Sequence, residues 1–201
     1  MTEPAQARDQ RRGDRRDGRQ PDLRERHTRD RAKHRATDRA VPGISSTSPL
    51  QTRYVPVGKM YFEGLSRLVA ADIELPGLRQ SQAETSPTTA PRLGFEAYPG
   101  LLATEVLGKQ SYKSDDKTKQ TPERLIARKD LVTALEHGQT RLGLRLKLTH
   151  AQRDKIVDDP RGDALDAVLC LIQAAWAQTQ GAPLYGLPEA MDPLEGWIVT
   201  A

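Results

Sequence analysis

The chain has 201 residues, 36% of them hydrophobic and 29% charged, with a formal net charge of +4 at pH 7. This length suggests one domain with some additional chain. No run of about 18 apolar residues is present, so neither a membrane-spanning helix nor membrane association is expected. We expect no secretory signal, and the single cysteine, Cys170, fits a reducing cytoplasm.

The positive charge is concentrated at the start of the chain. Residues 1–40 carry 13 Lys or Arg and 8 Asp or Glu, a net +5, whereas the rest carries 18 against 19. Residues 1–48 hold few apolar side chains to offset an ordering cost of about 1–2 kcal/mol per residue, so we predict a disordered Arg/Asp-rich tail. Such an arm can bind nucleic acid through phosphates, or it can be a solvated tail without a partner.

A third interpretation concerns the origin of this tail. Alternating Arg, Asp, Gly and Ala is what G+C-rich DNA yields when it is translated out of frame. Residues 1–48 would then be a misassigned start, which a three-frame translation of the upstream DNA tests.

Residues 49–201 have the composition of a folded domain. Apolar side chains at spacings of three and four predict a short helix around residues 62–69, and residues 81–91 form a polar loop with two prolines. Leu93, Phe95 and Ala97 then alternate with polar neighbours, which predicts a strand that ends at Pro99.

Helix signals dominate the second half of the chain. We predict a short helix at 101–108, a helix at 122–137 between an N-cap and a closing glycine, a helix at 150–159, and a short strand at 195–201. Three lysines in the loop at 111–120 can either meet a phosphate or be solvated.

Residues 162–177, GDALDAVLCLIQAAWA, predict a helix buried on most sides, with Asp163 and Asp166 at its start. In the simpler interpretation, Asp163 is the N-cap and Asp166 complements the positive end of the helix. In the other, Asp166 lies on a face that continues through Cys170 and Gln173, where a lone carboxylate needs an ionic partner or a metal.

Glu96 extends the metal interpretation, because it lies in the predicted strand between apolar neighbours. Glu96, Asp163 and Asp166 together would make an oxygen-only cluster, which selects Mg²⁺ or Mn²⁺. Paired ions of this kind hydrolyse phosphodiesters. The HExxH, GxSxG, GxxxxGK[ST] and GxGxxG patterns are missing from the sequence, which disfavours zinc protease, serine hydrolase and nucleotide-binding chemistry.

Five segments resemble the C-terminal part of the family called "domain of unknown function 429", whose members are predicted RNase-H-like nucleases. The segments are PVGKMYFEGLSRLVAADIELPGL, FEAYPGLLATEVLG with SYKSDDKTKQTPER, VDDPRGDALDAVLCLIQAAWA, and DPLEGWIVTA. The resemblance implies an α/β fold of the RNase-H-like type, with a mixed sheet flanked by helices. Asp163, Asp166 and Ala167 match the DxxDA pattern of its last helix, and Glu96 matches its strand acid.

The first strand of that family, which bears an aspartate, and its later IDxP-type motif have no counterpart in residues 1–50. We therefore expect an incomplete RNase-H-like domain at 49–201. It would be a metal-dependent nuclease or phosphodiesterase by resemblance, using Mg²⁺ or Mn²⁺ if the site is intact, and weakly active or inactive. The alternative is a non-catalytic nucleic-acid-binding or interaction protein that uses the Arg-rich arm. The oligomeric state is open.

Overall fold

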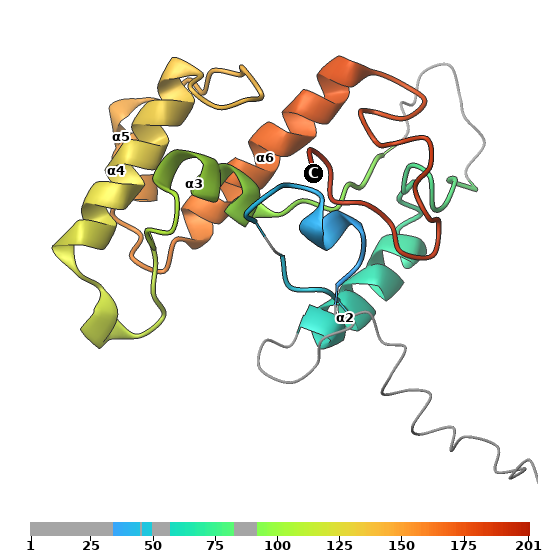
Figure 1. Cartoon of the computed structure of the whole chain (residues 1–201), viewed down its shortest axis with the longest axis horizontal. Coiled ribbons are helices and arrows are strands. Elements are labelled where there is room, and N and C mark those ends of the chain that lie inside the picture. Colours follow the sequence, from blue (N-terminus) through green and yellow to red (C-terminus); the bar gives the residue numbers. More distant parts are fainter. Residues whose placement is uncertain (1–33, 45, 50–56, 83–91) are drawn as a thin grey trace, which may run out of the picture. The chain divides into compact units, whose positions relative to one another are not determined.

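The computed structural model describes residues 34–44, 46–49, 57–82 and 92–201 (Figure 1). Five α-helices follow one another in this part of the chain: α2 (Val57–Ala70), α3 (Pro99–Leu107), α4 (Pro122–His137), α5 (His150–Val157) and α6 (Asp163–Gln180). Two short 3-10 helices, η1 (Thr37–Arg39) and η2 (Lys117–Lys119), accompany them. Most of the predicted tail, residues 1–33, lies outside the described residues, as does most of the loop predicted at 81–91.

The prediction of an α/β fold with an RNase-H-like mixed sheet is wrong, because the described part of the chain is helical and contains no strand. The segments predicted as strands pair only at isolated positions. Leu93 forms a parallel bridge with Glu74, and Glu96 forms one with Ile198. The predicted strands at 93–98 and 195–201 are therefore extended segments that touch at single residues.

A side chain from α6 explains why this pairing does not continue. The amide of Gln173, which is fully buried, accepts a hydrogen bond from the Tyr98 backbone N–H at 3.0 Å and donates to the Tyr98 carbonyl at 2.8 Å. The backbone groups that would extend a ladder beyond Glu96 are thus satisfied by a side chain. Pro99 then begins α3, where the chain turns away from extended geometry.

The predicted ends of α4 and the predicted start of α5 are confirmed, whereas α5 ends at Val157, two residues before the predicted end at 159. Thr121 precedes α4, and Gly138 closes it with a φ of 67°, a left-handed conformation that glycine adopts without steric cost. At the start of α5, Thr149 and Gln152 form a reciprocal capping box between their side chains and backbone N–H groups.

The main core lies where α3, α4, α5 and α6 pack together (Figure 1). The predicted stripe of α6 is confirmed, because Leu165, Leu169 and Ile172 are buried in this core. The prediction that α6 is buried on most sides is wrong, since Leu171 on its other face is 60% exposed. A second, smaller cluster forms around Ala177, Leu187 and Val199, with the side chains of Phe95, Ala97, Trp176, Tyr185, Met191 and Trp197 partly buried against it.

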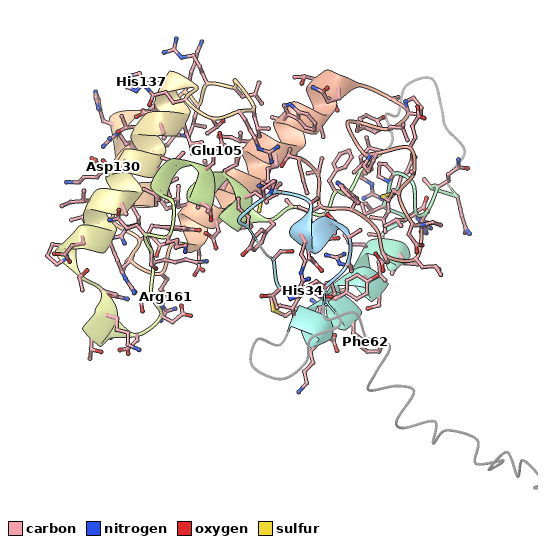
Figure 2. The ribbon with its side chains drawn as sticks, in the orientation of Figure 1. His34, Phe62, Glu105, Asp130, His137 and Arg161 are labelled. Carbon is pink, nitrogen blue, oxygen red and sulfur yellow. The ribbon has the colours of Figure 1, made fainter. Side chains whose placement is uncertain are left out.

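The predicted helix around residues 62–69 is confirmed as α2, but the described part of the chain covers its apolar side chains only in part. No residue of α2 is buried, and Phe62, which Figure 2 labels, is 75% exposed. This amphipathic helix presents a large apolar surface.

The described residues between 34 and 48 contribute to the folded part. Arg35, Thr37, Asp38, Ser46 and Ser48 are all buried. The Ile198 backbone N–H donates to the hydroxyl of Thr37 at 2.8 Å. The domain boundary at residue 48 stays a prediction. The Thr37–Ile198 contact joins the residues before this boundary to the C-terminal segment, residues 181–201 after α6.

The packing of α6 predicts unequal effects of two leucine substitutions on the same helix. Leu169→Ala removes a fully buried side chain and should lower the free energy of unfolding by about 2–5 kcal/mol. Leu171→Ala, at the exposed position, should change it by about 0.5 kcal/mol or less. Urea unfolding followed by circular dichroism measures both. Equal losses would contradict the described orientation of α6.

Candidate functional site

The guanidinium of Arg35, which is itself buried, is the centre of a partly buried polar cluster. Its Nη1 and Nη2 donate to the two oxygens of the Glu96 carboxylate at 2.8 and 2.5 Å. The carboxylate of Asp38 accepts from Arg35 Nε at 3.3 Å and from Nη2 at 3.0 Å, and from the hydroxyl of Ser46. Nη1 also donates to the Glu195 carbonyl at 3.0 Å. Arg35 therefore holds two carboxylates, and each of its five N–H groups has an acceptor.

The electrostatics of this cluster favour the ionised forms of Arg35 and Asp38. Burial alone would lower the pKa of Arg35, but hydrogen bonds and attraction from Glu96 and Asp38 outweigh it and raise that pKa above its ordinary value. Burial would likewise raise the pKa of Asp38, but hydrogen bonds from Arg35 and Ser46 lower it below its ordinary value. The cluster is thus a set of charged groups that stabilise one another.

Asp166 is the centre of a second cluster, at the start of α6. The Tyr112 hydroxyl donates to its Oδ1 at 2.5 Å, and Lys113 Nζ forms an ion pair with its Oδ2. The ammonium of Lys113 also lies 5.7 Å from the centre of the Tyr112 ring. Buried Arg128 fixes this segment by donating to the Tyr112 carbonyl at 2.8 Å and to the Val157 carbonyl at 2.6 Å.

The pKa values of two tyrosines near the clusters are raised. Burial, reinforced by the hydrogen bond to Asp166, raises the pKa of the Tyr112 hydroxyl well above its ordinary value. Burial also raises the pKa of Tyr98, which interacts electrostatically with Lys113 and Asp166 of one cluster and with Asp38 of the other. Tyr98 therefore lies within electrostatic reach of both clusters.

Asp163 is exposed, and it does not cap α6 as the simpler interpretation supposed. The N-cap is Gly162, with a left-handed φ of 76° and no side chain to accept a hydrogen bond. Asp159 caps the start of α6 instead, since its carboxylate accepts hydrogen bonds from the backbone N–H groups of Ala164 at 2.9 Å and Arg161 at 3.1 Å. Burial would raise the pKa of Asp159, but these backbone hydrogen bonds lower it.

The three candidate acids therefore stand in three settings. Glu96 pairs with Arg35, Asp166 pairs with Lys113 and Tyr112, and Asp163 faces solvent. Within residues 34–44, 46–49, 57–82 and 92–201, no three acidic, histidine or cysteine side chains are grouped as metal ligands. In this arrangement the donor set does not fit a single Mg²⁺ or Mn²⁺ shell, because oxygens that would bind the ion already accept hydrogen bonds from cations.

The sequence interpretation missed the partners of these acids. Arg35 and Asp38 belong to a segment predicted to be disordered, where a spacing of three was the one local signal of a contact. Lys113 was considered for phosphate, but it binds a carboxylate. No local sequence pattern indicates that Tyr112 binds Asp166, because the two residues are 54 positions apart in the sequence.

Comparisons of the chain with family models, curated proteins and solved structures find no significant match in any of the three. The resemblance to RNase-H-like nucleases stays a prediction. Of the helices in the described part of the chain, none combines the length and apolar character needed to cross a membrane.

The pKa of Asp38 predicts how folding stability depends on pH. Since its pKa in the folded chain lies below the unfolded value of about 3.9, the ionised carboxylate stabilises the fold above that pH, and this contribution is lost as the pH falls through the folded pKa. Asp38→Asn should lower the free energy of unfolding at pH 7 by about 1–3 kcal/mol and flatten its decline below pH 4.

Urea unfolding from pH 7 to pH 3 measures this dependence. Asp130→Asn on the exposed surface of α4 (Figure 2) is the matched control and should keep the wild-type profile. An Asp38→Asn profile that parallels the wild type throughout would contradict the role of this carboxylate.

Proposed function

We propose that this chain is a weakly active or inactive relative of metal-dependent phosphodiesterases, in which basic side chains hold the acids that would otherwise bind the ion. The observation that carries the proposal is the pair of contacts Glu96–Arg35 and Asp166–Lys113. The inference that phosphodiesters are the substrate class rests on the sequence resemblance alone.

The energetics of these pairs support weak metal binding. A hydrogen bond to a charged group contributes about 1.5–3 kcal/mol, and Glu96 accepts two of them from one guanidinium. An ion that displaced Arg35 from Glu96 would leave a buried cation whose only carboxylate partner among the described residues is Asp38, with the Glu195 carbonyl as its one other acceptor. This is costly, because the hydration of the guanidinium is not restored. Each 1.4 kcal/mol lost in this way weakens metal binding about tenfold.

The Asp166 pair is the weaker of the two, because both of its side chains are partly exposed, 41% for Lys113 and 22% for Asp166. Removing the Lys113 ammonium frees one carboxylate oxygen and leaves the Tyr112 hydroxyl bond in place. Lys113 is therefore the residue at which the metal affinity of the chain is most easily changed.

The charge distribution favours a second candidate function. The net +5 of residues 1–40 contrasts with a nearly neutral remainder, which favours a non-catalytic role in which the Arg-rich arm binds nucleic acid. Residues 1–33 lie outside the described residues, so this candidate rests on composition.

The first proposal predicts that Lys113→Gln binds Mn²⁺ severalfold more tightly than the wild type does, because a partly exposed ion pair contributes up to about 1 kcal/mol. Lys117→Gln, in the same loop but exposed, is the control and should bind like the wild type. Electron paramagnetic resonance of free Mn²⁺ measures both affinities. In parallel, the wild type with Mg²⁺ or Mn²⁺ should cleave DNA and RNA no faster than buffer. Cleavage by the wild type that disappears in Asp166→Asn would contradict the proposal.

The second candidate predicts that binding of a duplex oligonucleotide weakens steeply with salt, by about a thousandfold or more between 50 and 200 mM if six or more phosphates are contacted. A chain that lacks residues 1–32 is the control, because it keeps every described residue, and it should lose the binding. Fluorescence anisotropy measures both. Salt-independent binding, or equal binding without these residues, would exclude the arm as the binding element.

A further inference from the structure

We propose that a groove between α2 and the C-terminal segment binds an amphipathic organic cation, with the apolar body of the ligand in the groove and its ammonium at Glu96 and Glu195. The proposal is independent of phosphodiesterase chemistry. It rests on a cavity, on the charges at its mouth, and on the bonding of Arg35.

The cavity has a volume of about 410 Å³, within the range of about 300–1,000 Å³ typical of small-molecule sites. Its walls are mostly apolar and aromatic. They come from α2, from the turn around Pro76, from the extended segment at 94–96 and from the C-terminal segment, and include Met60, Leu68, Leu78, Phe95, Met191 and Trp197.

Several of these wall residues are exposed to a degree that is unusual for large apolar side chains. Met60 is 66% exposed, Leu78 46% and Leu68 41%. Contiguous exposed apolar surface of this kind marks ligand or partner sites in folded proteins. The walls supply aromatic rings as well, and Phe95 is held in place by an edge-on contact with Tyr185 at 5.4 Å between ring centres.

The mouth of the groove has a negative charge. A smaller adjoining cavity is lined by Arg35, Glu96 and Glu195, and it shares Tyr61 and Leu78 with the larger one. Arg35, its partner Asp38 and the two glutamates carry one positive and three negative charges, a net −2.

The hydrogen bonds of Arg35 determine whether the mouth of the groove favours an anionic or a cationic ligand. All five of its N–H groups already donate to Asp38, Glu96 and the Glu195 carbonyl, so it has no donor left for an anionic ligand. The Glu96 side chain is 38% exposed and keeps lone pairs free, and Glu195 is exposed. A ligand therefore meets acceptors at the mouth, and an ammonium satisfies them while an aromatic or aliphatic body fills the groove.

A matched series of three probes tests this inference: 4-phenylbutylamine, 4-phenylbutan-1-ol and 4-phenylbutyrate, which share one body and differ in charge. Isothermal titration calorimetry on the full chain measures their affinities. The amine should bind with a Kd below about 1 mM, and about tenfold more tightly than the alcohol. The carboxylate should bind most weakly.

Two variants separate the contributions of charge and groove. Glu195→Gln should weaken the amine severalfold and leave the alcohol unchanged, whereas Glu189→Gln, an exposed residue outside both linings, should change neither. Leu78→Ala should weaken all three probes. Equal binding of amine and carboxylate, or no binding of the amine below about 10 mM, would overturn the proposal. A dimer seen by light scattering and broken by Leu78→Arg, with no amine binding, would assign the groove to a second copy instead and would also overturn it.

Discussion

The saturated guanidinium of Arg35 is the interaction on which the arrangement of the candidate site depends. It joins three remote parts of the chain, since Asp38, Glu96 and the Glu195 carbonyl all accept its hydrogen bonds. Removing ions from water costs several kcal/mol each, and this cost is offset only when every donor and acceptor is satisfied. The cluster meets that condition for Arg35. A metal ion would therefore have to displace the guanidinium of Arg35 before it could bind the Glu96 carboxylate.

The same principle operates at the start of α6, where Asp166 is satisfied by Tyr112 and Lys113. Like charges repel, and here each acid is compensated by its own neighbouring base and not by a cation shared among them. Glu96 has two roles in consequence, because it is the partner of Arg35 and also an acidic wall of the apolar groove. The Arg35 cluster thus has two effects. It disfavours a divalent metal ion at Glu96, and it supplies the negative charge by which the groove would prefer an organic cation.

The sequence predicted what is encoded locally and missed what depends on remote partners. The two ends of α4 and the start of α5 follow from capping signals close to them in the sequence, and the buried stripe of α6 follows from its periodicity. The alternation of apolar and polar residues at 93–97 also matches the packing, since Phe95 and Ala97 pack against the smaller hydrophobic cluster around Ala177, Leu187 and Val199. A sheet, however, needs neighbouring strands, and here the buried amide of Gln173 satisfies the Tyr98 backbone in their place. Arg35 and Glu96 are 61 positions apart, so no local pattern indicates that they pair.

We infer that Glu96, Asp163 and Asp166 do not share a divalent cation, because Glu96 and Asp166 are each paired with a different base. The most direct test is a Mn²⁺ titration of the wild type, Glu96→Gln and Asp166→Asn, with the free ion measured by electron paramagnetic resonance. The structure predicts that neither substitution weakens Mn²⁺ binding by tenfold, because each of these carboxylates is already paired with its own base. A loss of about tenfold or more in each of the two variants, both still folded, would show that the two acids share one ion and would contradict the account.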